Sequence, residues 1–474
     1  MSLPGFVYTD HMLSAVRARL ASRLNDPDNC FWSSTELDWY LQEALDCWGL
    51  YARYFSVRGT LTVTAGEFEA DLSAVSTTAF DGVTAESALS FSVSGQKILK
   101  ACLLHLLETR STDLTTYTAT GHISTDLLNH YIPLAVNQFL QESFSYVTKR
   151  EYPLTSAVLS SNSGRFTLDE KINNLVRVEH ISLESNVRNL RRVSLNDAKN
   201  LRSNVWNSQS RPEFYTIETT PMLQMYLLPW PNDLATLRLY SVEHTKLASN
   251  LYATDQSFSF PYEFWWAVKF LTLYKVYSTD GPTQYPQMAE YCLKRYKECL
   301  TVARDYSSLN FAWVEERPMH LSPMTEFDNM YAGWRNRSAI DLDAGGRLNK
   351  ELGIMSPNKI FLRSKYSRDI SLSFDLVRNA PTLTSTDEFP VGEDYLPYIL
   401  DYAEHLACIK MGGKEFSDSY PLYESFLAGA MRLNDRLKAS IASLNPPSKV
   451  AYRQSQSSQE SDKREAKVGV GGQG

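Results

Sequence analysis

The stretch from Ser257 to Tyr306 constrains the fold of this chain more than any other part of the sequence. It opens with a short strand-like edge, and residues 262–277 then predict a helix. The helix breaks at residues 278–282, which contain Asp-Gly-Pro, and a second helix is expected to run to about Asp305.

The first of these two helices carries apolar side chains round almost its whole circumference. Lys269, Thr272 and Lys275 define one polar stripe, but Trp265 and Val268 lie within it. Such a helix is buried on more than one side, either in the middle of a large domain or at a subunit interface. Burial in the core alone and burial in the core together with an interface both fit the sequence. The candidate subunit-interface residues are Phe264, Trp265, Trp266, Phe270 and Tyr274.

The composition places the chain among folded proteins and bears on its partners. Its 474 residues are enough for two or three domains with full cores, and 12% of them are aromatic. Tyr and Trp are enriched at protein interfaces, which mildly favours an assembling protein. The formal net charge of −7 gives no overall basic field that would attract nucleic acid or an anionic membrane.

The sequence also predicts a location inside the cell. The first residues lack the basic and apolar regions of a secretory signal. The purely apolar runs are far shorter than the ~20 residues needed to span a bilayer. Six cysteines are scattered through predicted helices, which is typical of reduced core thiols in a cytosolic protein.

The order of predicted elements indicates an α+β fold, with helical hairpins or a bundle and an inserted antiparallel β-sheet or small sandwich. Ser33 and Glu36 stand at capping-box spacing before an amphipathic helix, and residues 57–72 alternate as a β-hairpin does. The predicted regions are a mainly helical region with that β-hairpin (1–150), an antiparallel β region (151–256), a central helical hairpin (257–309), an extended arm with strands (310–386), a C-terminal helical hairpin (387–445) and a flexible polar tail (446–474).

Alternating apolar and polar residues predict the individual strands of the later regions. The predicted strands are 176–183, 212–217, 222–228, 234–242, 359–363 and 370–377, with a short helix at 195–202.

Two features of the second half bear on assembly. Residues 257–305 and 387–444 share a Phe-Pro start, a first helix, a Gly-containing break and a longer second helix. A true duplication and two unrelated helical hairpins both fit this likeness. Residues 310–352 show no period, and an irregular run of this length predicts an extended arm that reaches a neighbouring subunit.

No motif in the sequence predicts an active site. Gly412-Gly413-Lys414 lacks the first glycine, the following hydroxyl residue and the preceding strand of a P-loop, so a helix break is expected there. Residues 341–346 have no downstream Glu at EF-hand spacing. The pairs His405/Cys408 and Cys292/Cys299 bring no further ligands at zinc-like spacing. We therefore expect a protein that is not an enzyme, without catalytic, cofactor-binding or metal-binding residues.

Five stretches carry a family resemblance: the helical runs Glu36–Leu45 and Ile98–Glu108, and the segments Pro212–Tyr215, Met225–Pro231 and Leu237–Tyr240, which precede the Phe-Pro helix pair. Together they resemble the head-to-tail connector proteins of tailed bacteriophages, the adaptor or head-completion family. The resemblance covers residues 30–310 loosely. The second helix pair and the arm are not features of the compact adaptors. The position of this protein within the neck or tail therefore stays open.

The resemblance implies a structural virion protein that forms a ring of about a dozen copies. Its partners would be further copies of itself, the portal protein and a tail or nozzle protein, without membrane contact. DNA would pass through the lumen without specific binding, which suits an acidic chain because many Lys or Arg contacts would grip phosphate. The location would be the virion neck or tail, and the host cytoplasm during assembly. The candidate portal-docking residues lie in the tail: Lys449, Arg453, Lys463, Arg464 and Lys467.

Other functions stay open at this point. The nearest alternative is a tail or fibre-attachment protein of the neck. From other classes, the chain fits a virion-associated hydrolase or a host-binding module supplied by residues 154–247. A hydrolase needs a pocket that gathers acids or histidines with perturbed pKa values. The eight histidines, however, are scattered along the sequence.

Overall fold

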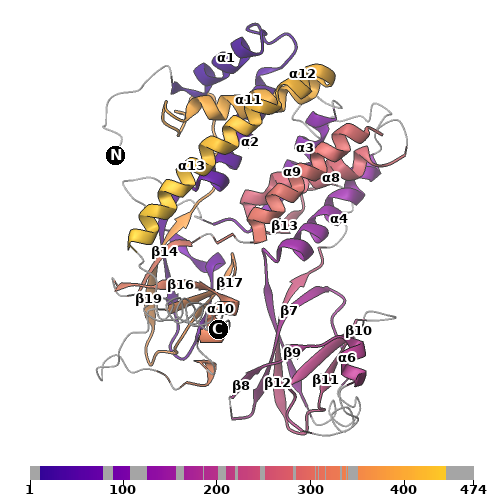
Figure 1. The fold of residues 1–474 in the computed structure, drawn as a ribbon, viewed down its shortest axis with the longest axis vertical. Coiled ribbons are helices and arrows are strands. Elements are labelled where there is room, and N and C mark those ends of the chain that lie inside the picture. The colour runs from indigo at the N-terminus through magenta and orange to yellow at the C-terminus, as the bar shows by residue number, and fades with distance from the viewer. Residues whose placement is uncertain are drawn as a thin grey trace, which may run out of the picture.

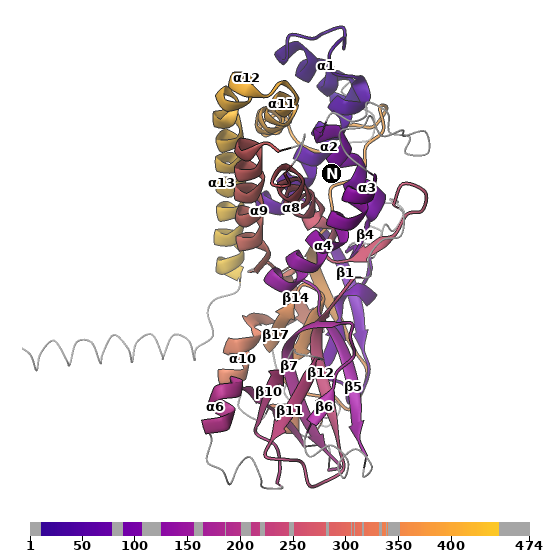
Figure 2. The same ribbon diagram turned by 90° about the vertical axis from the view of Figure 1, so that its right-hand side faces the viewer.

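The molecule has a helical body at one end and two β bodies at the other, as the computed structural model shows (Figures 1 and 2). The structure describes residues 11–77, 89–106, 125–155, 165–184, 186–200, 210–218, 223–245, 251–280, 284–304, 306–307, 309–314, 317–330, 334–337, 339 and 351–444. It contains both helices and mixed or antiparallel sheets, which confirms the predicted α+β class.

The helical body is built from segments that are distant in the sequence. It contains α1 (Leu13–Arg23), α2 (Ser34–Ala52), α3 (Gly95–His105), α4 (Thr125–Ser143), the 3₁₀ turn η3 (Tyr262–Phe264), α8 (Trp265–Tyr277), α9 (Pro286–Arg304), α11 (Leu396–Met411), α12 (Gly413–Asp418), α13 (Tyr420–Leu444) and the strand pair β4 (Ser92–Ser94) and β13 (Ser257–Ser259). One continuous apolar cluster joins these elements. The predicted capping box starts α2, where the Ser33 side chain accepts from the Glu36 N–H and the Glu36 carboxylate accepts from the Ser33 N–H.

Helix α8 lies in the middle of this body. It packs against α3, α4 and α9, and only the side chains of Tyr274, Lys275 and Tyr277 keep part of their surface exposed. The prediction that this helix is buried on more than one side is confirmed. Thr272 of the predicted polar stripe is fully buried, and its hydroxyl donates to the Val268 carbonyl at 2.9 Å. Lys269 and Thr272 therefore form an internal polar seam, while Lys275 is partly exposed.

The first β body is called the split β body, because residues 56–77 and 309–377 build it together. One sheet has the order β15-β14-β19-β1-β3 and the other the order β16-β17-β18-β2. The elements are β1 (Ser56–Val63), β2 (Glu69–Asp71), η2 (Leu72–Ala74), β3 (Ser76–Thr77), β14 (Leu309–Val314), β15 (Arg317–Pro318), β16 (His320–Pro323), α10 (Met324–Met330), η4 (Trp334–Asn336), β17 (Glu351–Ser356), β18 (Lys359–Leu362) and β19 (Ile370–Val377).

The predicted β-hairpin at residues 57–72 is wrong, although both of its strands exist. Strand β1 pairs along its whole length with β19, and β2 pairs with β18 in the other sheet. The turn between them contains Gly66 at φ 82°, and its N–H donates to the Tyr366 carbonyl, so the turn itself is tied to a distant segment. Local alternation marked the strands but not their partners.

The described parts of residues 310–352 do not form the predicted extended arm. Strand β14 pairs antiparallel with β19, and β16 pairs parallel with β17. Helix α10 follows directly and buries Phe327 against β17. These segments pair with strands of their own chain, and the expected contact with a neighbouring subunit stays a prediction. Residues 340–350 lie outside the described part.

The second β body is called the central β body and spans residues 148–243. Its sheets have the orders β5-β12-β7-β8 and β6-β11-β10-β9, and one apolar cluster draws residues from both. The elements are β5 (Thr148–Leu154), β6 (Arg165–Thr167), β7 (Ile172–Ser182), β8 (Val187–Asn189), β9 (Arg191–Arg192), α6 (Leu195–Asn200), β10 (Phe214–Glu218), β11 (Gln224–Leu228) and β12 (Ala235–Glu243). The strand predictions at 176–183, 212–217, 222–228 and 234–242 and the helix prediction at 195–202 agree with these bounds to within a few residues.

The two β bodies meet at an aromatic cluster containing Phe68, Tyr240, Trp334 and Phe361. Two asparagines clamp the bodies across it. The Asn358 amide accepts from the Val147 N–H at 3.1 Å and donates to the Val147 carbonyl at 3.0 Å. Asn336 makes the same two bonds with Val187, at 2.6 and 3.2 Å.

Candidate functional site

A fully buried ion pair lies at the centre of the helical body. Lys269 of α8 has no exposed surface, and its ammonium donates to Glu43 of α2 at 2.5 Å and to His105 Nε2 of α3 at 2.9 Å. Burial and the adjacent Lys269 hold the pKa of His105 well below its usual range, so the ring is neutral and its Nε2 can accept. One cation therefore ties three helices together.

The candidate interface residues of α8 belong to this interior. Phe264, Trp265, Trp266 and Phe270 have no exposed surface within the single chain, while Tyr274 is half-buried. The Trp265 indole N–H donates to the Asp46 carboxylate at 2.8 Å. This placement agrees with the core alternative, because four of the five side chains have no surface left for a second chain to contact.

A buried arginine joins helix α9 to helices α11 and α13. Arg295 of α9 has no exposed surface, and its guanidinium carbon lies 3.8 Å from the centre of the Tyr423 ring of α13. The same guanidinium donates to the Tyr402 hydroxyl of α11 at 2.7 Å and to the Glu298 carboxylate at 3.0 Å. Glu298 also accepts from the Tyr423 hydroxyl at 2.6 Å, so the cation connects α9 with α11 and α13.

The His and Cys pairs singled out in the sequence are core residues. His405 bonds the Tyr291 hydroxyl and the Ser419 hydroxyl, each at 2.8 Å, and burial lowers its pKa to about 3. Burial also raises the pKa of the Cys292 thiol to about 12, which keeps it protonated and unreactive. Among the described residues, no group of three or more His, Cys, Asp or Glu side chains is placed to hold a metal ion.

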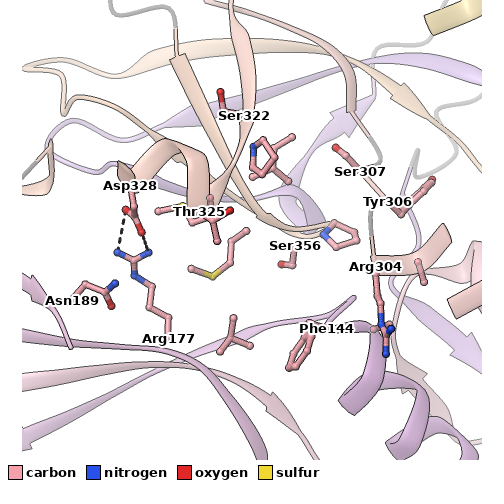
Figure 3. Close-up of a pocket in the computed structure, with 18 of the residues that line it drawn as sticks. Phe144, Arg177, Asn189, Arg304, Tyr306, Ser307, Ser322, Thr325, Asp328 and Ser356 are labelled. Carbon is pink, nitrogen blue, oxygen red and sulfur yellow. Dashed lines mark hydrogen bonds and ion pairs between the residues drawn. The ribbon is translucent and has the colours of Figure 1, made fainter. Parts of the chain in front are cut away.

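A cavity of about 950 Å³ opens where the helical body meets both β bodies (Figure 3). The ends of α4 and α9 form one wall, residues 189–192 with Val176 and Arg177 form the second, and residues 321–325 with 354–357 form the third. The lining combines serine and threonine hydroxyls with apolar side chains such as Leu190, Met324 and Ile354. We call this space the junction cavity.

The junction cavity carries a cationic excess. Arg177, Arg191, Arg192 and Arg304 line it, against the carboxylates of Glu142 and Asp328. Arg177 is neutralised by ion pairs with Glu179 and Asp328, and Figure 3 shows the pair with Asp328. Asp328 also accepts from the Trp334 indole at 3.0 Å. No described carboxylate pairs with Arg191, Arg192 or Arg304, although Arg304 Nε donates to the Glu142 carbonyl at 3.0 Å.

Phe144 lines the same cavity and has an unusual backbone conformation. It follows α4, has φ 53°, and its N–H donates to the Leu140 carbonyl at 3.0 Å. This left-handed position after a helix normally holds Gly or Asn, because a side chain there costs free energy. Phe144 is 38% exposed, so more than half of its surface is covered by the rest of the chain.

The two carboxylates of the junction cavity, Glu142 and Asp328, both have partners within the chain. The described lining includes no His, Cys or Lys. Glu142 accepts from Gln138 and from the Tyr296 hydroxyl, and Asp328 is held by Arg177. Both carboxylates therefore serve structural contacts.

Sequence reasoning missed every residue of this cavity. The adjacent arginines at 191–192 and the aromatic residue directly after a helix were the available signals, but each is common on protein surfaces. The candidate docking residues Lys449, Arg453, Lys463, Arg464 and Lys467, the loop 341–346 and the tail lie outside the described residues.

Comparison with known proteins adds no identification. No protein family matches the sequence, and no curated protein matches it. Within the described part of the chain, none of the helices has the length and apolar character that crossing a bilayer requires.

Proposed function

We propose that this chain is a structural virion protein, a subunit of a head-to-tail adaptor ring that joins portal to tail in a tailed bacteriophage. The observation that carries the proposal is a multi-armed unit in which asparagine clamps join the two β bodies and buried cations hold the helices of the third body together. Such a unit suits mechanical connection, because each body presents a separate surface to a neighbour while the joints hold their relative positions.

The stretches that resemble connector proteins lie in the elements that build this frame. Residues 36–45 belong to α2 and supply Glu43, and residues 98–105 belong to α3 and supply His105. The other stretches fall in β10, β11 and β12, directly before η3 and α8. The net charge of −7 is compatible with DNA passing through a lumen without being gripped.

The helix pairs α8/α9 and α11/α13 are proposed to be two copies of one helical hairpin. Each has a very apolar first helix in the interior and an amphipathic second helix, and Arg295 connects them. If subunits contact through this body, the exposed apolar side chains of Met411 and Met431, 44% and 52% exposed, are better placed than the buried aromatics of α8.

Electron microscopy of the purified protein, alone and mixed with portal-bearing heads, tests the proposal. We expect closed rings of about a dozen copies that attach to the portal vertex. Deleting residues 446–474 is expected to leave the fold intact and weaken that attachment. A chain that remains a monomer and does not attach to heads would overturn the proposed function.

A further inference from the structure

We propose that the junction cavity binds an acidic peptide segment contributed by a partner protein. The inference goes beyond the proposed virion role and does not depend on it, because it rests on the charge, chemistry and size of the cavity alone.

Three arginines of the cavity lack a described carboxylate partner. Arg191 and Arg192 are exposed on β9, Arg304 is exposed at the end of α9, and none of the three has a carboxylate partner in the described part of the chain. Elsewhere the arginines of this acidic protein are commonly paired, as Arg188 is with Glu213 at 2.7 Å. Three unpaired guanidinium groups on one cavity form a local field that favours an anionic ligand.

The chemistry of the lining narrows the class of ligand. All four of its basic side chains are arginines, whose planar fork matches the oxygens of a carboxylate or a phosphate. The lining also contains Phe144, Leu190, Met324 and Ile354, which offer apolar contacts beside the charges. An extended peptide places alternate side chains on opposite sides, so acidic residues interleaved with apolar ones fit both kinds of surface.

Size separates a peptide from nucleic acid. A volume of about 950 Å³ lies at the upper end of the range for small-ligand pockets and admits a short segment of chain. A DNA duplex cannot enter such a space, and nucleic-acid surfaces are usually far more positive than this one. The net charge of −7 over the whole chain further disfavours phosphate backbones outside the cavity.

Phe144 supplies an independent observation. Phe144 lines the cavity and is 38% exposed, while its backbone holds a left-handed conformation that this residue type rarely adopts. Strained residues of this kind cluster where a protein contacts ligands. The exposed part of the Phe144 ring can contact an apolar side chain of a bound segment. The free energy of this contact would offset the cost of the unfavourable backbone conformation.

Fluorescence anisotropy with a labelled short peptide in which Glu alternates with Leu tests the proposal on the full chain. The matched peptide alternates Gln with Leu, and a labelled single-stranded oligothymidine represents phosphate anions. We expect saturable binding of the Glu-Leu peptide that weakens as salt rises. The Gln-Leu peptide and the oligonucleotide are expected to bind at least tenfold more weakly.

Matched substitutions locate the binding. Arg304→Gln is expected to weaken binding about tenfold, and the double variant R191Q/R192Q more than tenfold, because each removes a charged hydrogen-bond donor. Arg188→Gln removes a nearby exposed arginine outside the lining and should change affinity less than about twofold. Phe144→Asn keeps a residue suited to the left-handed backbone, so weaker binding at unchanged melting temperature would support a contact from the ring.

Three results would overturn the inference. The first is absence of saturable binding at low salt. The second is tighter binding of the oligonucleotide than of the Glu-Leu peptide. The third is an equal loss of affinity in R188Q and in R191Q/R192Q, which would show a general effect of surface charge.

Discussion

The helical body and the joint between the two β bodies both contain buried charges, but the two regions use them differently. In the helical body Lys269 and Glu43 are shielded from water, with 0% and 4% of their side chains exposed. At the joint, Arg177 pairs with Asp328, which keeps 26% of its side chain exposed, and Lys149 with 28% exposed pairs with Glu69. Water and salt screen these two pairs and not the pair in the helical interior. Glu179 at the joint is shielded as well, since it is fully buried beside Arg177 and Arg335, whose side chains are 8% and 5% exposed. The exposed ion pairs should therefore contribute little to the joint, and its buried contacts, the asparagine clamps and the aromatic cluster among them, should contribute most.

Removing the central cation should give the largest effect. Lys269→Met leaves Glu43 buried without its partner and His105 without its donor, so the free energy of unfolding should fall by about 3–5 kcal/mol. Urea denaturation followed by circular dichroism measures the change. Arg188→Gln, which breaks an exposed pair, is the control and should cost less than about 1 kcal/mol. Similar losses for both variants would remove the distinction between dry and solvated pairs.

Glu263 gives the helical interior a pH dependence of its own. Its carboxyl is buried, accepts from the Tyr306 hydroxyl at 3.4 Å, and burial raises its pKa to about 7. Between about pH 4.3 and that value the unfolded chain releases a proton that the folded chain retains. This group's contribution to stability is therefore complete below about pH 4.3 and is lost as pH rises to about 7, by roughly 3 kcal/mol.

Glu263→Gln should remove this loss. Relative to the original chain, the variant should gain stability as pH rises from about 4.3 to about 7. Above about pH 7 the difference in unfolding free energy should stay constant. Urea titrations at a series of pH values measure the difference. The buried histidines titrate equally in both proteins, so they cancel in the comparison. If the unfolding free energies of the two proteins depend on pH in the same way, the pKa of the Glu263 carboxyl is not raised by burial.

At the joint, a neutral clamp should matter more than the exposed ion pairs. Asn358→Ala leaves the Val147 N–H and carbonyl without their partners, which should cost about 1–3 kcal/mol. Because these groups are uncharged, the cost should not change between low and high salt. Lys149→Gln, which removes a partly exposed cation, is the matched variant and should cost less, with an effect that shrinks as salt rises. A salt-sensitive Asn358 effect would show that the joint is mainly electrostatic.

The sequence predicted the features that depend on residues close together in the chain, and it did not predict pairing between distant segments. The burial of α8, the capping box of α2 and the strands β7 and β10–β12 follow from residues close together in the chain. The partner of β1 lies about three hundred residues away, at β19, and alternation carries no information about such distant pairing. For that reason residues 57–72 suggested a hairpin, and the strands within 310–352 looked like an arm.

The charged sites were harder to predict than the fold. Glu43, His105 and Lys269 look like ordinary surface residues until three distant helices bring them together. The junction cavity draws its walls from three bodies, and each contributing segment is unremarkable by itself. Phe144 departs from a local rule, since it occupies a helix end where glycine is usual, and it lines the cavity. Arg53 departs from the same rule at the end of α2, with φ 51°, and does not line the cavity.

Phe144 therefore provides the smallest but most specific test. Phe144→Gly removes the left-handed strain but also removes a ring that is more than half covered. The two effects are each about 1–2 kcal/mol and opposite in sign, so the free energy of unfolding should change by less than about 1 kcal/mol. Gly66→Ala is the opposite control: Gly66 has φ 82° with open space around it, so a methyl group there should cost about 1 kcal/mol through the backbone alone. If Phe144→Gly stabilises the chain and weakens peptide binding, the ring is kept for contact with a ligand. If it destabilises the chain, the ring packs on the joint and its strain has a structural cause.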